Sequence, residues 1–177
     1  LTERSDSAVL PLVDGFAAVI SGSCSAATLG QVAHWSARHP HHHIDPLAIA
    51  KGADGAGAAI AWALRHLQDG PVLIAASQPP EQVKRIQTEL GREVAGTLIE
   101  ETLARIAAGL VAAGVRRFVV AGGETSGAVV QRLGVQALRI GPEIDPGVPW
   151  TESLSDPPLA LALKSGNFGG VDFFDKA

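Results

Sequence analysis

The sequence predicts a layered α/β/α domain around a mostly parallel, or mixed, central sheet. Short apolar runs rich in β-branched residues alternate with helical stretches, a pattern typical of parallel sheets covered on both faces. Of the 177 residues, 46% are hydrophobic, 20 are glycine and only 5% are aromatic. In addition, polar glycine-rich turns follow several of the predicted strands. These observations favour one α/β domain over a β-sandwich or a disordered chain.

Composition argues against several other classes of protein. The formal net charge of −4, without a basic stripe, speaks against nucleic-acid binding. No apolar run approaches the roughly 20 residues needed to cross a bilayer, so we expect no membrane association. The single cysteine, Cys24, rules out an internal disulfide and is typical of the reducing cytoplasm, where we expect this protein to work.

The sequence lacks methionine, even at position 1, so we expect it to begin inside a longer gene product. Residues 1–15 are interpreted as an interdomain connection or the start of the domain. Residues 16–177 are then one domain, because this length suffices for one packed core and is short for two.

In the first half of the chain, residues 16–20 are predicted as a strand and 26–38 as a helix. The histidine run at 39–43 could bind zinc or nickel, but it contains Pro40 and lacks a nearby cysteine, so we interpret it as a solvated loop without metal. Residues 44–50 are predicted as an edge strand interrupted by Pro46. The other elements expected here are helices over 58–67, 81–90 and 93–113 and a strand over 72–76.

In the second half, residues 118–121 are predicted as a central buried strand, and Arg116 and Arg117 as surface charges just ahead of it. A helix is expected over 127–133. The three prolines within 141–149 favour an extended loop there. The remaining predicted strands cover residues 136–140, 150–154 and 159–163.

Three polar turns follow predicted strands, at residues 21–25, 122–126 and 164–170. Glycine lets the backbone approach a ligand, a helix start has unpaired N–H groups, and hydroxyl groups add donors. In parallel sheets ligands bind beyond the carboxyl ends of the strands, so we predict one shared phosphate site. Each turn alone could equally be an ordinary capped connection. Glu124 would oppose direct phosphate contact unless a metal ion or water intervenes.

Four motifs carry a resemblance to a known family. They are I-S-G-S-C-S at 20–25, G-G-E-T-S-G-A-V at 122–129, R-I-G-P-E-I-D-P-G-V-P at 139–149 and L-K-S-G-N-F-G at 163–169. Together they resemble the C-terminal nucleotide-binding domain of the four-carbon acid sugar kinases. Within that family the 3-oxo-tetronate kinases are most similar, and the threonate and erythronate kinases are near relatives.

The resemblance implies a kinase that uses ATP and Mg²⁺, with the sugar acid bound mainly by a separate N-terminal domain. The acidic D-D-x-T-G-A-type motif of that domain is not in this chain, so the chain alone should bind nucleotide without turnover. No catalytic base is assigned. The resemblance places nucleotide contacts at Ser21, Gly123, Glu124, Thr125, Ser126 and Gly166, with Ser23, Gly122 and Asn167 flanking them.

Several alternatives stay open at this point. Lys164 either pairs with phosphate or is an ordinary surface lysine, and Glu124 either holds magnesium through water or caps a helix. The chain could be a non-catalytic module for nucleotide sensing or oligomerisation, and its apolar helix faces allow a homo-oligomer. A Schiff-base enzyme using Lys164 would require a desolvated lysine with a depressed pKa.

Overall fold

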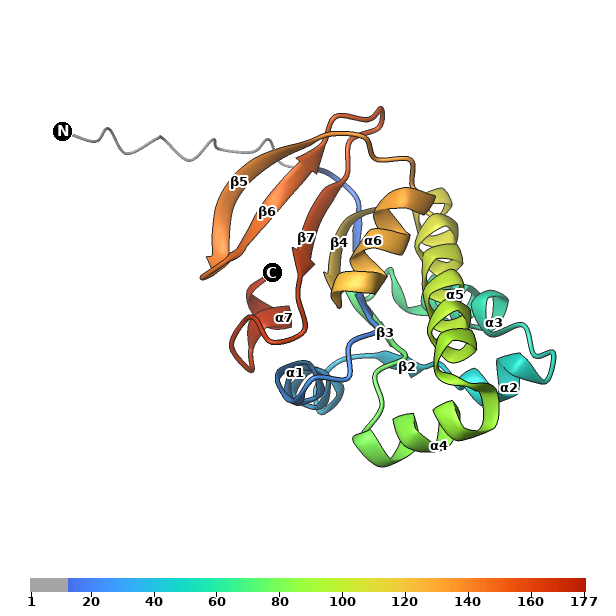
Figure 1. The fold of residues 1–177 in the computed structure, drawn as a ribbon. Helices are drawn as coiled ribbons and strands as arrows, with labels where there is room; N and C mark the ends of the chain where they lie inside the picture. Colours follow the sequence, from blue (N-terminus) through green and yellow to red (C-terminus); the bar gives the residue numbers. More distant parts are fainter. Residues whose placement is uncertain (1–12) are drawn as a thin grey trace.

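The structure is a computed structural model that describes residues 13–177; residues 1–12, most of the expected interdomain connection, lie outside it. A seven-stranded sheet runs through the molecule in the order β2-β3-β1-β4-β7-β6-β5 (Figure 1). The first five strands in this order are parallel, whereas β6 and β5 are antiparallel to their neighbours. The mostly parallel sheet is thus confirmed. The strands are β1 (Phe16–Ser21), β2 (His41–His43), β3 (Val72–Ala75), β4 (Val115–Ala121), β5 (Leu138–Asp145), β6 (Val148–Ser153) and β7 (Ala160–Lys164).

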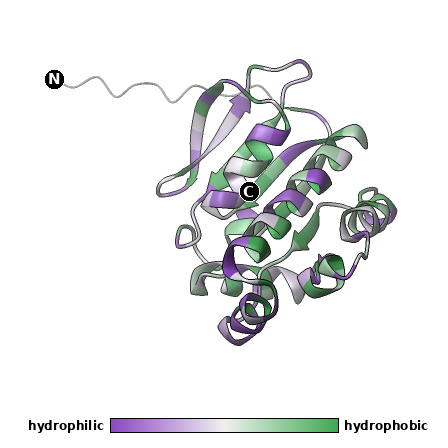
Figure 2. Ribbon diagram, turned by 45° about the vertical axis from the view of Figure 1, so that its right-hand side comes forward, coloured by the Kyte–Doolittle hydropathy of each residue, from purple (hydrophilic) through white to green (hydrophobic). Residues whose placement is uncertain are grey.

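Helices cover both faces of the sheet, as the sequence predicts. On one face pack α3, α5 and α6, and on the other α1 and α7. Both hydrophobic and hydrophilic stretches mark the helices in Figure 2, as expected of helices with one buried side. The helices are α1 (Ala26–Ser36), α2 (Pro46–Ala50), α3 (Gly55–His66), α4 (Pro80–Leu90), α5 (Arg92–Ala112), α6 (Gly123–Arg132) and α7 (Phe173–Lys176).

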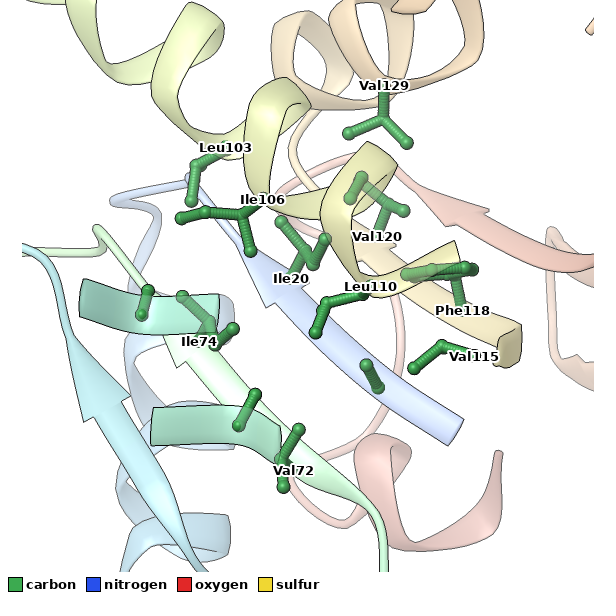
Figure 3. Close-up of a cluster of buried hydrophobic side chains, with 14 of the residues drawn as sticks. Ile20, Val72, Ile74, Leu103, Ile106, Leu110, Val115, Phe118, Val120 and Val129 are labelled. Atoms are coloured by element: carbon green, nitrogen blue, oxygen red, sulfur yellow. The ribbon is translucent and has the colours of Figure 1, made fainter. Parts of the chain in front are cut away.

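The larger core lies between the sheet and α5 (Figure 3). Ile20 of β1, Val120 of β4 and Leu110 of α5 are fully buried there. Each such side chain stabilises the fold by about 1.5–3 kcal/mol through removal of apolar surface from water. Successive strand residues point to opposite faces, so Val19 packs on the other side, in the cluster with Trp35 of α1. The strands are therefore apolar throughout.

The histidine run forms a strand, so its interpretation as a loop was wrong. β2 pairs in parallel with β3, with His41 opposite Leu73. At the edge of the sheet, imidazole rings can stay partly in contact with water. The ring of His42 packs 5.4 Å from that of Trp62, while the His41 and His43 rings lie 5.6 Å apart on the other face. Within residues 13–177 no group of three or more metal-binding side chains of histidine, cysteine, aspartate or glutamate occurs.

Two further predictions are corrected by local hydrogen bonding. Residues 44–50 contain a helix rather than a strand, because Asp45 Oδ1 accepts from Leu47 N at 2.9 Å and Pro46 occupies the first helical position. Residues 141–149 belong to the β5–β6 hairpin rather than to a loop. The backbone turns around Pro146 and Gly147, Pro142 falls at a register shift in the outermost strand β5, and Pro149 lies near the start of β6.

Smaller differences concern element boundaries. Helix α6 begins at Gly123, within the predicted turn at 122–126, rather than at residue 127. Arg116 and Arg117 lie within β4 rather than ahead of it. In the part of the chain that the structure covers, no helix combines the length and the apolar character that a membrane span requires.

Candidate functional site

The three polar turns start at the same level of the sheet. Strands β1, β4 and β7 are neighbours, and their register places Ser21 beside Ala121 and Ala121 beside Lys164. The backbone N–H groups of Gly22 and Ser23 donate to the Ala121 carbonyl oxygen at 3.0 and 3.1 Å. The Gly122 N–H donates to the Lys164 carbonyl oxygen at 2.9 Å. The turns at 21–25, 122–126 and 164–170 therefore form one continuous corner, called here the three-turn corner.

Glycine allows the turns to approach each other closely. Gly122 has φ of +126°, a region that side chains disfavour, and a Cβ atom there would lie 3.0 Å from Thr125 Oγ1. A Cβ at Gly22 would overlap the same hydroxyl. The Thr125 side chain is thus enclosed by the first two turns. Thr125 also lines the hollow that opens at the corner, so its hydroxyl can reach a ligand there.

Two helices begin at the corner with unpaired backbone donors. In α6 the first intrahelical bond is donated by Ser126 N to Gly122 O at 2.8 Å, and no side chain caps the helix. The N–H groups of Gly123, Glu124 and Thr125 find no acceptor among residues 13–177. The start of α1 is partly satisfied, since Ser25 Oγ accepts from Thr28 N at 3.2 Å. Unpaired N–H groups at a helix start attract anions.

Side chains at the start of and within α1 donate hydrogen bonds to the backbone carbonyl groups of the third turn. The Gly166 carbonyl oxygen accepts from Ser25 Oγ at 2.5 Å and Thr28 Oγ1 at 2.8 Å. Gln31, which is 1% exposed, donates through Nε2 to the carbonyl oxygens of residues 168, 169 and 170 at 2.9–3.0 Å. These carbonyls are therefore turned toward α1. The N–H groups of Gly166 and Asn167 have no acceptor within the described chain.

Lys164 is buried beneath the third turn, with 1% of its surface exposed, which excludes the alternative that it is an ordinary surface lysine. Its Nζ donates to Thr28 Oγ1 at 3.0 Å, to the Ser165 carbonyl at 3.2 Å and to the Gly166 carbonyl at 3.1 Å. Burial lowers the pKa of this ammonium group to about 8. Desolvation and a lowered pKa are what the Schiff-base alternative requires, but the burial of Nζ against three oxygen atoms leaves no open approach for a carbonyl substrate and argues against it.

The predicted site residues occupy different depths of the corner. Ser21 is fully buried, and its Oγ lies 2.7 Å from Ser77 Oγ. This hydrogen bond links the end of β1 to the segment that follows β3. Ser23, in the first turn, lies against the third turn, because a Cβ at Gly166 would overlap its hydroxyl. The Ser126 hydroxyl makes a long contact of 3.5 Å to the Val120 carbonyl. Gly123, Glu124 and Asn167 are exposed on the surface of the corner.

A hollow of about 380 Å³ opens at the corner, lined by Ser23, Cys24 and the second turn. Sequence reasoning missed Thr28 and Gln31, which position the third turn without facing this hollow. Both are buried polar residues in the otherwise apolar stripe of α1. That departure from the helical pattern was the available signal, since a buried polar group must find a hydrogen-bond partner.

Residues 18–174 match the protein family described as "Nucleotide-binding C-terminal domain". The chain belongs to this family. Among its curated relatives, the 3-oxo-tetronate kinase of Burkholderia multivorans is 59% identical over 177 residues. The 3-oxo-tetronate kinase of Cupriavidus necator is 60% identical over 178 residues. Each comparison covers 100% of this chain and 41% of the relative.

A solved structure shares the fold of this nucleotide-binding C-terminal domain. The crystal structure of a Haemophilus influenzae protein superposes with a TM-score of 0.89 at 37% identity. The superposition covers 99% of this chain and 42% of that one. The chain thus spans about two fifths of the length of the proteins it matches. Family membership directs attention to a nucleotide, and the three-turn corner is its candidate site.

Proposed function

We propose that the three-turn corner binds the phosphates of ATP together with Mg²⁺. The observation that carries this proposal is the shared register of β1, β4 and β7, which brings three donor-rich turns together. Within the second turn, Gly123 and Thr125 offer unpaired N–H groups and Thr125 also offers its hydroxyl, whereas the Ser126 hydroxyl is held only by a long 3.5 Å contact to the Val120 carbonyl. Gly166 and Asn167 of the third turn offer two further N–H groups. The start of α6 adds about 0.3–1 kcal/mol for a negative group placed there.

The residues present also fit a magnesium ion at the phosphates. Glu124 is an exposed carboxylate beside the unpaired N–H groups of α6, and hard oxygen ligands are what Mg²⁺ prefers. Magnesium usually takes one or two carboxylates plus phosphate oxygens and water, so one glutamate is sufficient. When bound, the ion would neutralise phosphate charge. Glu124 would hold it, directly or through water.

We further propose that the chain is the nucleotide-binding part of a kinase that phosphorylates a four-carbon sugar acid. Its relatives are named 3-oxo-tetronate kinase, which makes 3-oxo-tetronate the first candidate substrate, with threonate and erythronate as alternatives. The chain spans 41% of those relatives, and we assign the sugar acid mainly to the remainder. Phosphoryl transfer depends largely on positioning and charge neutralisation, which is what the corner supplies.

Calorimetric titration of the chain with Mg-ATP tests the phosphate site. Thr125→Ala should weaken binding at least tenfold, because it removes a hydroxyl donor at the corner and a charge-assisted hydrogen bond contributes about 1.5–3 kcal/mol. Gly166→Val should abolish binding, because its side chain would overlap Ser23 and Ser25. Thr88→Ala on the exposed side of α4 is the matched control. Unchanged affinity in both corner variants would refute the assignment.

A further inference from the structure

A second cavity, of about 750 Å³, opens beside the corner between α4 and the first turns of α5. It shares Cys24 and Glu124 with the smaller hollow, so the two spaces adjoin. Its walls are apolar where Val83 and Ile86 of α4 face Ile99 of α5. Amide and hydroxyl groups are also among its lining residues. Ligand sites for small organic molecules combine these features: an apolar wall with a few polar groups.

Gly96 of α5 leaves open space on one side of this cavity. It lies within α5, where glycine destabilises a helix by about 0.5–1 kcal/mol relative to alanine. Protein packing does not require it, because an added Cβ would meet only Glu100 Oε1, at 3.9 Å. Gly109 in the same helix is different, since a Cβ there would overlap Ile60. The room at Gly96 opens into the cavity instead.

The charges in the cavity determine what kind of group fits. Three carboxylates, those of Glu93, Glu100 and Glu124, line it against the single guanidinium of Arg92. Desolvation, with a smaller contribution from the charge of Glu124, raises the pKa of Glu100. These carboxylates would repel an anion placed in the cavity itself. A flat, uncharged group with N–H and hydroxyl donors suits both the apolar wall and the carboxylate rim.

We propose that the α4–α5 cavity holds the base and ribose of the nucleotide whose phosphates bind at the three-turn corner. This inference rests on the proposed function, because it extends the same ligand. The base packs against the wall formed by Val83, Ile86 and Ile99, and the ribose passes Cys24 and Glu124, where the two spaces adjoin. Gly96 leaves the space that the nucleoside fills.

Binding of two probes to this chain tests the proposal: ADP, which has a nucleoside, and inorganic tripolyphosphate, which has none. Gly96→Leu fills the cavity with a good helix former. We expect it to weaken ADP binding at least tenfold and to change tripolyphosphate binding less than twofold, both measured by calorimetry in magnesium buffer. Glu101→Leu, an exposed position on the same helix outside the cavity, is the control and should change neither affinity.

The outcomes separate this inference from the proposed function. If Gly96→Leu binds ADP normally, or if the unsubstituted chain binds tripolyphosphate as tightly as ADP, the nucleoside assignment is wrong and the phosphate site stands. If the unsubstituted chain binds neither probe, the proposed phosphate site is refuted, and with it the nucleoside assignment that rests on it. Should Gly96→Leu lose both probes, Val83→Phe fills the cavity from α4. Loss of both probes in that variant as well would overturn the inference.

Discussion

Lys164 is a buried ammonium group whose hydrogen-bond partners are all neutral oxygen atoms. No carboxylate within residues 13–177 forms an ion pair with it. Desolvation therefore dominates, and it lowers the pKa to about 8. A phosphate at the three-turn corner would bring negative charge close to this cation. Lys164 is thus expected to affect stability and ligand binding in opposite directions as pH rises.

Stability without ligand should increase with pH above about 8. In the unfolded chain a lysine has a pKa of about 10.4, so between that value and the folded value of about 8 the unfolded state binds more protons. The free energy of unfolding then rises with pH over this window. Urea unfolding midpoints at pH 7.5, 8.5 and 9.5 measure the slope. Lys164→Met should lack this contribution, and equal slopes in both proteins would contradict the lowered pKa.

Nucleotide affinity should show the opposite trend. Deprotonation of Lys164 above pH 8 removes a positive charge beneath the third turn, so Mg-ATP binding should weaken roughly tenfold between pH 7 and pH 9.5. Calorimetric titration at several pH values measures this change. In Lys164→Met the affinity should already be low at pH 7 and should vary little with pH. A lysine that only fills space would produce no such difference between the two proteins.

Among the elements, α1 positions the third turn, although the two are far apart in sequence. Gln31 alone donates to three successive carbonyl groups, and Thr28 and Ser25 bind a fourth. Because these carbonyl groups point toward α1, the N–H groups of Gly166 and Asn167 are left without an acceptor in the described chain. Helix α1 therefore contributes to the site mainly by fixing the backbone of residues 164–170 rather than by contacting a ligand.

Replacing Gln31 tests this role of α1. Gln31→Leu preserves the size of the side chain and leaves three carbonyls without a donor, so it should destabilise the fold by about 1–3 kcal/mol. Amide hydrogen exchange at Gly166 and Asn167 should accelerate more than exchange in β1. Gln131→Leu, at an exposed position of α6, is the control and should leave both unchanged. Equal acceleration throughout the chain would indicate a loss of global stability only.

For the whole molecule, the chain should bind nucleotide but should not complete the reaction alone. It spans 41% of the kinases it resembles, and the sugar acid is assigned to the remainder. We expect no ADP production from Mg-ATP and 3-oxo-tetronate with this chain alone. Addition of the separately produced N-terminal remainder should restore ADP production in a coupled assay. Binding of ATP without restored activity would favour a nucleotide-sensing or oligomerisation module instead.

The sequence alone determined the class of the fold, because the alternation of apolar runs and helical stretches is a local property. It located β1, β3 and β7 to within one residue and the carboxyl end of β4, and it identified the glycine-rich turns that follow three of them. Predictions from local sequence failed where pairing between strands outweighs the preference of individual residue types for a loop. The histidines of β2 form a strand only because β3 offers a free edge, and Pro142 is tolerated in β5 because that strand is outermost.

Only the tertiary structure decided how the turns combine into a site. Strand order and register join residues that lie more than a hundred positions apart, such as Ser25 and Gly166, and no local pattern encodes such a pairing. Burial of Lys164 likewise depends on where α1 packs. The space at Gly96 becomes meaningful only when α4 and α5 are placed together beside the turns. The sequence therefore supplies the hydrogen-bond donors of the turns, and long-range packing brings these donors together at one corner of the sheet.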